Sequence, residues 1–208
     1  MKVKSSFLRV FAMGVILGLS IRSGAQIVGL PVLDTADARD SHFQITPGVA
    51  WGDEMNFTGA RATIPLFDEC RMFLDVGRLD VKGGNSNLGM QAGALYSFPM
   101  TDLCDTAVRG ALYYANTDHM DITGGNLMMV FSGQTLMSDD LYAYSGFGLD
   151  TSIRKTQTRY TRLSSSHTDY NPAVALGLMF KVTEKIGLFV EGEYVDGFYG
   201  SGGVSFRF

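Results

Sequence analysis

The sequence predicts an all-β fold, a closed antiparallel transmembrane β-barrel of ten strands preceded by a signal peptide, on three observations. Runs of about ten residues recur in which apolar and polar side chains alternate, and turn residues bound each run. Beyond the N-terminus no stretch reaches the roughly 20 apolar residues that a spanning helix needs, although 46% of the 208 residues are hydrophobic. The chain has 25 Gly and only 5 Pro, a composition that suits a narrow barrel.

The N-terminus has the three parts of a secretory signal peptide. Basic residues precede an apolar run from Val10 to Ile21, and small residues end at Ala25, where we place cleavage before Gln26. A retained membrane anchor is the alternative, but the run is shorter than the roughly 20 residues that cross a bilayer. The expected division is a signal peptide at 1–25, a periplasmic lead-in segment at 26–41, which can tuck into the lumen, and the barrel at 42–208.

Four alternating runs follow the lead-in segment, each with an apolar face for lipid and a polar or small face for the lumen. The runs and their outward residues are 42–51 with Phe43, Ile45, Val49 and Trp51; 57–66 with Ala60, Ala62, Ile64 and Leu66; 71–81 with Met72, Leu74 and Val76; and 88–98 with Leu88, Met90, Ala92, Ala94, Tyr96 and Phe98. The third run loses phase near Gly77, after which Leu79 and Val81 look outward, so we expect a bulge there.

Six further runs complete the barrel. They are 105–116 with Val108, Leu112 and Tyr114 outward; 123–133; 141–153 with Leu141, Ala143, Phe147 and Leu149; 170–182 with Val174, Leu176, Leu178 and Phe180; 186–195 with Leu188, Val190 and Tyr194; and 200–208 with Val204, Phe206 and Phe208. The run 123–133 has the weakest signal because residues 127–131 are apolar on both faces. If it does not span, a second span must also be lost to keep the number even, which gives eight strands.

The final strand carries a resemblance to a known family. The segment Gly202-Gly203-Val204-Ser205-Phe206-Arg207-Phe208 resembles the C-terminal assembly signal of bacterial outer-membrane proteins, in which Val204, Phe206 and Phe208 would be the signal residues. With the signal peptide and the strand pattern, the chain is similar to the small outer-membrane β-barrel superfamily, which includes opacity-type and outer-membrane-protein-A-type barrels.

The resemblance implies a location and partners but not one activity. It implies the outer membrane of a Gram-negative-type bacterium, insertion by the barrel-assembly machinery, and contact with outer-membrane lipid and lipopolysaccharide. We expect a monomer, and the net charge of −4 gives no basic surface for nucleic acid. A secreted soluble β-sandwich is the alternative, but its outer faces should be polar where this chain has Leu176, Leu178, Val190 and Phe206.

The alternation places eight charged residues in the lumen. They are Arg61, Asp75, Arg109, Asp150, Lys181, Glu191, Glu193 and Arg207. Because both signs are present and a narrow barrel leaves little room, we expect a neutralised plug of ion pairs. A small polar pore lined by the same charges is the alternative.

The sequence offers weak catalytic and metal candidates. His167 lies within Ser164–Asp169, which holds the residue types of a Ser/His/Asp site, but neighbours in one loop rarely have triad geometry. His119 lies between Asp118 and Asp121, which together offer the residue types of a metal site, but solvated loop residues are the simpler interpretation. We therefore expect no catalytic, cofactor or metal site.

The two cysteines, Cys70 and Cys104, fall in predicted periplasmic turns, and an oxidising compartment favours a disulfide between them. The turns lie two strands apart, about 10 Å, so Cys104 must lean toward Cys70 to come within the roughly 7 Å that a bridge needs. Two free thiols are the alternative.

The expected function is non-enzymatic, a structural or surface-interaction role in the outer membrane. A narrow porin-like passive channel is the alternative, and a membrane-embedded hydrolase or acyltransferase is less favoured. The longest predicted outer loop, 154–169, carries the basic and aromatic residues Arg154, Lys155, Arg159, Tyr160 and Arg162. It is either a plain solvated loop or a contact for anionic lipopolysaccharide or a host surface.

Overall fold

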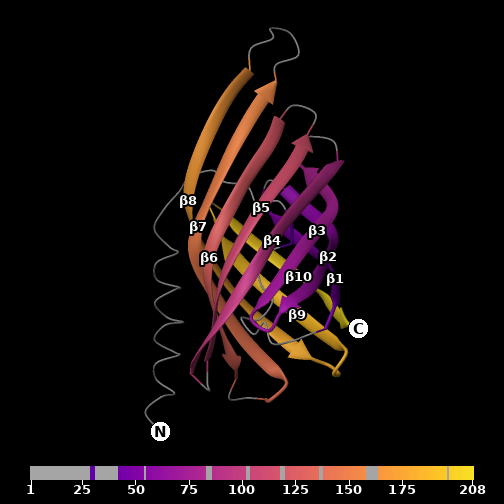
Figure 1. Cartoon of the computed structure of the whole chain (residues 1–208). Coiled ribbons are helices and arrows are strands. Elements are labelled where there is room, and N and C mark those ends of the chain that lie inside the picture. The colour runs from indigo at the N-terminus through magenta and orange to yellow at the C-terminus, as the bar shows by residue number, and fades with distance from the viewer. Residues whose placement is uncertain are drawn as a thin grey trace.

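Ten antiparallel strands close into one barrel (Figure 1). The computed structural model describes residues 29–30, 42–53, 55–82, 86–101, 104–117, 120–135, 138–157, 164–195 and 197–208. The strands are β1 (Gln44–Gly52), β2 (Met55–Phe67), β3 (Cys70–Val81), β4 (Ser86–Thr101), β5 (Cys104–Thr117), β6 (Met120–Gln134), β7 (Leu141–Gln157), β8 (Ser164–Lys181), β9 (Ile186–Tyr194) and β10 (Phe198–Arg207). Each strand pairs with its neighbours in the chain, and β1 pairs with β10 to close the sheet. The predicted ten-stranded barrel is confirmed, and the eight-stranded alternative is wrong.

The outer face of the barrel is apolar on every strand. Large hydrophobic side chains are exposed there, among them Trp51, Ile64, Leu74, Leu88, Leu112, Leu127, Leu149, Leu178, Val190 and Phe206. Polar and charged side chains alternate with them and are buried inside, as the sequence pattern predicts for a strand with one face toward lipid. A closed single sheet also excludes the two-sheet sandwich that the sequence left as an alternative.

No helix in the described part of the chain has the length and apolar character to cross a membrane. The predicted signal peptide, residues 1–25, lies outside the described residues. Of the predicted lead-in segment, 26–41, only Gly29 and Leu30 are described, and both are buried inside the barrel.

The bulge expected at Gly77 is wrong. Gly77 pairs without interruption with Gly59 on β2 and Gly89 on β4, and the inward phase of β3 continues to Leu79, which is fully buried. The lumen is apolar at this level, where Leu79 packs with Phe57 and Leu30, so an apolar side chain there does not mark the lipid face. The register shifts instead between Pro65 and Phe67 and between Pro99 and Thr101. A proline, which lacks the N–H that a regular ladder uses, lies at each of these two shifts.

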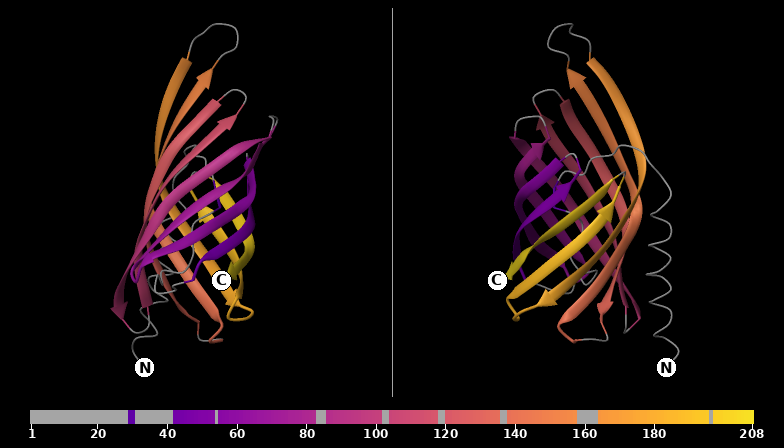
Figure 2. Two further views of the ribbon diagram at one scale, coloured as in Figure 1. Left: turned by 45° about the vertical axis from the view of Figure 1, so that its right-hand side comes forward. Right: turned by 180° about the vertical axis from the view of Figure 1, so that it is seen from behind.

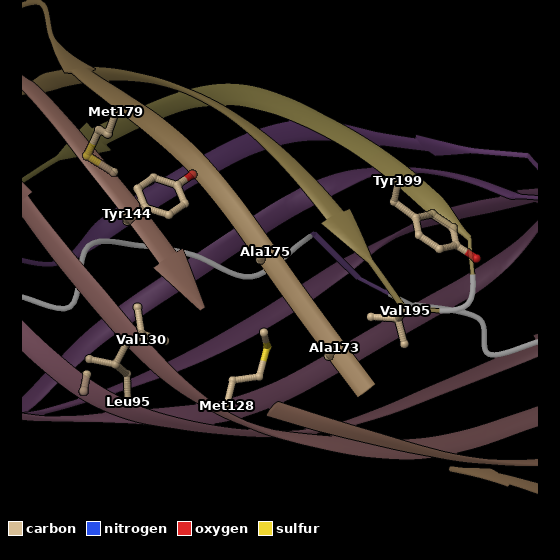
Figure 3. Packing of buried hydrophobic residues seen from close by; sticks show 10 residues of the cluster. Leu95, Met128, Val130, Tyr144, Ala173, Ala175, Met179, Val195 and Tyr199 are labelled. Carbon is tan, nitrogen blue, oxygen red and sulfur yellow. The ribbon is translucent and has the colours of Figure 1, made fainter. Parts of the chain in front are cut away.

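The weakest predicted strand, 123–133, is a full strand, β6. Its inward residues Met128 and Val130 pack in an apolar cluster with Leu95, Tyr144 and Met179 (Figure 3). The run is apolar on both faces because the outward side chains form part of the apolar outer face while the inward ones line an apolar part of the lumen.

The strands differ widely in length, so the rim of the barrel is uneven. β1 and β9 have 9 residues each, whereas β7 has 17 and β8 has 18. The β7–β8 pair therefore projects farthest at one end (Figures 1 and 2). The long loop expected at 154–169 is consequently wrong, because β7 continues to Gln157 and β8 begins at Ser164. Backbone pairing continues through this polar stretch, with Arg154 opposite His167.

The expected disulfide is not formed, and Cys70 and Cys104 are both free. Cys70 is level with Tyr96 on β4, and Tyr96 is level with Val108 on β5. Cys104 precedes Val108 by four residues on β5, a distance of about 13 Å at the usual rise per residue. The two cysteines are therefore offset along the strands by this distance and also lie two strand spacings apart, about 10 Å. Their separation is well beyond the roughly 7 Å between Cα atoms that a disulfide tolerates.

Candidate functional site in the lumen

The best-formed ion pair in the lumen joins Arg61 and Asp75. The two residues are direct partners across β2 and β3, and both side chains point inward. Arg61 Nε donates to Asp75 Oδ1 at 2.7 Å and Arg61 Nη2 donates to Asp75 Oδ2 at 2.8 Å, with 6% and 0% of the two residues exposed. A fork with two parallel hydrogen bonds is the geometry in which a guanidinium and a carboxylate satisfy each other best when buried.

The same pair holds the backbone of Leu30, which comes from the N-terminal segment. The Leu30 N–H donates to Asp75 Oδ2 at 3.1 Å, and Arg61 Nη2 donates to the Leu30 carbonyl oxygen at 2.8 Å. The Leu30 side chain is fully buried in an apolar cluster with Phe57, Leu79 and Tyr113. The backbone of this residue is therefore bound at both its donor and its acceptor within the lumen.

A second arginine, Arg109 on β5, extends the network. Its Nη1 donates to Asn126 Oδ1 at 2.5 Å, and its Nη2 donates to Gln91 Oε1 at 3.2 Å. The guanidinium groups of Arg61 and Arg109 each lie 4.6 Å from the centre of the Phe73 ring. Phe73 thus stabilises both cations through its π face while contributing no charge of its own.

The opposite wall of the lumen is acidic. Asp150 on β7 and Glu191 and Glu193 on β9 are at least 97% buried, and Tyr113 Oη donates to Asp150 Oδ1 at 2.9 Å. Asp150 Oδ2 and Glu193 Oε2 have no hydrogen-bond partner among the residues that the structure describes. The two cations on β2 and β5 therefore face carboxylates on β7 and β9 across the lumen.

Two of the eight predicted lumenal charges lie outside this buried network. Lys181 is only half-buried, and its Nζ donates to the Tyr142 hydroxyl at 3.1 Å and lies 4.5 Å from the centre of the Tyr142 ring. Arg207, next to the C-terminus, is also half-buried. The other six, Arg61, Asp75, Arg109, Asp150, Glu191 and Glu193, are buried in the lumen.

Sequence reasoning missed several lumenal residues. Arg71 on β3 is 2% exposed and faces inward in the same phase as Phe73 and Asp75, so the alternation already marked it. The alternation placed Gln91 on the inner face but gave it no role, and Asn126 was missed, because uncharged amides carry no charge signal. No period-2 pattern could have placed Leu30, since Gly29 and Leu30 do not lie in a strand.

The histidine candidates do not form a catalytic arrangement among the described residues. His167 Nε2 lies 3.0 Å from Asp169 Oδ1, and Asp169 Oδ2 lies 3.3 Å from Arg154 Nη2. The His167 side chain is 78% exposed, and Ser166, its neighbour in the strand, points to the opposite face. The side chains of Ser164 and Ser165 lie outside the description.

The metal candidate is only partly described. Asp118 and His119 lie outside the described residues, and Asp121 accepts a hydrogen bond from Asn116 Nδ2 at 2.5 Å. Across the described part of the chain, no three His, Cys, Asp or Glu residues are placed to hold a metal ion.

No family model and no curated protein matches this chain. Among solved structures it is similar to outer-membrane β-barrels. The KdgM porin is 11% identical with a TM-score of 0.44, and the match covers 79% of this chain and 99% of that one. The outer-membrane protease OmpT of Escherichia coli is 8% identical with a TM-score of 0.45, covering 85% and 99%. The N-terminal barrel domain of OprF from Pseudomonas aeruginosa is 14% identical with a TM-score of 0.41, covering 81% and 98%.

Proposed function

We propose that this protein is a non-enzymatic outer-membrane β-barrel with a closed lumen, a structural platform that presents its projecting strands at the cell surface. One observation carries the proposal: apolar side chains cover the outside of a closed sheet, while the charged side chains are buried inside it. A soluble protein rarely exposes a continuous apolar surface of this size. A closed barrel is also one of the two structures that satisfy every backbone polar group within lipid.

The closed lumen is supported by what fills it. Arg61, Phe73 and Arg109 reach into the interior from one wall, and Leu30 occupies space inside the barrel. The buried ion pair and its hydrogen bonds form the neutralised plug that we favour over an open passage.

A narrow passive channel is the second candidate, and the acidic wall favours it. Asp150, Glu191 and Glu193 are three carboxylates buried close to one another, and a passage along them would prefer cations.

Surface interaction is assigned to the β7–β8 pair, which projects at one end of the barrel (Figure 1) and in which Arg154 lies opposite His167 and Lys155 opposite Ser166. The basic side chains suit the phosphate groups of lipopolysaccharide. The Asp169 carboxylate on β8 supports a structural role for this region, since Arg154 on β7 lies against one of its oxygens and links the two strands, while His167 of the same strand lies against the other oxygen.

Two measurements test the proposal. Fractionation of cells that express the full chain should recover it in the outer membrane, with folded protein that migrates differently from boiled protein on a gel. Purified barrel in planar bilayers should pass no steady KCl current. Recovery in the soluble fraction would overturn the membrane location, and a steady current would favour the channel instead.

A further inference from the structure

Gly29 and Leu30 contact four successive strands of the barrel wall. The Leu30 backbone is bound by Arg61 on β2 and Asp75 on β3. A Cβ added to Gly48 on β1 would lie 3.1 Å from Leu30 Cδ2, so the leucine side chain packs over that glycine. On the other side, Gly29 lies against Gln91 on β4. These two residues alone therefore bridge a large part of the lumen wall.

The position before Leu30 accepts only glycine. Gly29 has a φ of +117°, a conformation that side chains other than hydrogen rarely adopt. A Cβ there would also lie 2.9 Å from Gln91 Cβ and 3.1 Å from Asp75 Oδ2. The lumen wall and the backbone conformation together therefore require glycine at position 29. The apolar surroundings of position 30 favour an aliphatic side chain there.

The chemistry of the wall matches a peptide backbone. Asp75 accepts from the N–H, Arg61 donates to the carbonyl of the same residue, and the two side chains are locked by their own bidentate pair. A buried backbone residue requires both partners, and here both come from one preorganised ion pair. Leu79, Phe57 and Tyr113 then form an apolar pocket for the side chain.

We propose that Arg61 and Asp75 form a binding site for a peptide backbone inside the lumen, that its ligand is Gly29–Leu30 of the chain's own N-terminal segment, and that this binding closes the barrel. The closure rests on the membrane location proposed above, whereas the binding site does not. Within the described part of the segment, Gly29 and Leu30 are held by two backbone hydrogen bonds and the packing of the leucine side chain, and neither residue lies in a strand, so these contacts can break without any strand being unpaired.

The binding site is tested by the accessibility of position 30. Leu30→Cys is introduced into a Cys70→Ser, Cys104→Ser background, folded in detergent, and labelled with a large hydrophilic maleimide. Labelling at position 30 should be at least about tenfold slower than at Asp53→Cys, an exposed turn residue. The reason is that the large maleimide reaches the thiol at position 30 only in the fraction of molecules in which Gly29 and Leu30 are released. Adding Gly29→Ala should raise the rate at position 30 about tenfold, since it strains the bound conformation and leaves the wall intact.

Gly197→Ala is the matched control, because an added Cβ there meets nothing closer than 3.8 Å. It should leave the labelling rate unchanged. Equal labelling rates at position 30 with and without Gly29→Ala, or rapid labelling in the parent, would overturn the binding site.

Closure is tested by KCl current in planar bilayers, with Gly29→Ala in the otherwise unmodified chain. The variant should show steady current where the parent shows none. Closure would be overturned if Gly29→Ala passes no current although the same change exposes position 30 to the maleimide in the Leu30→Cys background. Fractionation of the same variants separates a failure of closure from a failure of the proposed function. A chain absent from the outer membrane contradicts the membrane role. The labelling rate at position 30 in detergent tests the binding site independently of that result.

Discussion

Tyr144 on β7 and Gly177 on β8 are direct partners across the sheet, and the tyrosine ring lies over the glycine (Figure 3 shows Tyr144). A Cβ added to Gly177 would overlap two carbon atoms of that ring. Tyr113 and Gly124 repeat the relationship between β5 and β6, where an added Cβ would overlap the Tyr113 hydroxyl oxygen. Glycines on the inner wall therefore make room for the aromatic rings that fill the lumen.

Gly177→Ala should destabilise the barrel by about 1–3 kcal/mol, because the buried Tyr144 ring must move. Urea unfolding of the detergent-folded barrel measures the loss. Gly187→Ala is the control on the same inner face, since its nearest neighbour atom would lie 3.8 Å away. The control should match the parent or slightly exceed it in stability. Equal losses for the two variants would show that the ring does not need the space above Gly177.

Removing one member of the Arg61–Asp75 pair should cost more than removing both. Asp75→Leu leaves Arg61 buried without its main partner, and such a change costs about 3–5 kcal/mol. The double variant Arg61→Met, Asp75→Leu should lose less, since no charge is left unpaired. Urea unfolding of the two single variants, Arg61→Met and Asp75→Leu, and of the double variant completes a double-mutant cycle and gives the coupling energy between the two residues. Arg78→Met, which breaks the exposed Arg78–Asp80 pair on the same strand, is the control and should have little effect. Additive losses at positions 61 and 75 would contradict the coupling.

Much of the barrel could be predicted from sequence because each strand has an apolar outer face and a mostly polar lumenal face, which gives the chain a period-2 pattern. The faces of β1, β4 and β10 follow that pattern without exception among the predicted outward residues. The prediction failed where this physical contrast disappears. Leu79 is apolar and buried, because the lumen itself is apolar at that level.

The ends of strands were harder to predict than their faces. Residues 154–157 and 164–169 are polar on both sides and therefore look like a loop, yet they pair as strands beyond the apolar part of the barrel. Backbone hydrogen bonding and polar contacts such as the Arg154–Asp169 ion pair extend them, and neither leaves a hydrophobic signature. The lumenal charges could be predicted one by one, but not their partners, since partners depend on the stagger between strands. The same stagger separates Cys70 from Cys104.

Arginine at Val190 should be costly if the outer face meets lipid. Val190 on β9 points outward and is 53% exposed in the isolated barrel. Val190→Arg should cost about 2–4 kcal/mol in a bilayer, because a charge near mid-depth loses its hydration. Thr168→Arg, an exposed position on the projecting part of β8, is the matched control and should be tolerated. Folding titrations in lipid vesicles measure both. Equal tolerance at positions 190 and 168 would mean that the apolar face does not contact the hydrocarbon.

Phe208 should act in assembly more than in the stability of the finished barrel. Its N–H donates to the Phe43 carbonyl at 3.0 Å and its ring lies 6.1 Å from the Phe43 ring, but its side chain remains 68% exposed. Phe208→Ala should therefore reduce the amount of folded protein in the outer membrane of cells, while refolding in detergent is nearly unchanged. Ser166→Ala, an exposed change far from the terminus, is the control for both assays. Parallel losses in cells and in detergent would assign Phe208 a purely structural role.

Trypsin added to whole cells should cut this chain within 158–163 and spare its neighbours. Arg159 and Arg162 lie between the ends of β7 and β8, whereas Arg154 and Lys155 are held in the ladder opposite His167 and Ser166. A protease needs an extended, unpaired segment, so strand residues resist cleavage. Within 154–167, mass spectrometry of the fragments should report cuts after Arg159 or Arg162 only, and the variant Arg159→Gln, Arg162→Gln should stay intact in this stretch. Cuts after Arg154 or Lys155 would show that the projecting strands separate in solution. Cleavage that requires an opened outer membrane would place this end of the barrel in the periplasm and invert the topology.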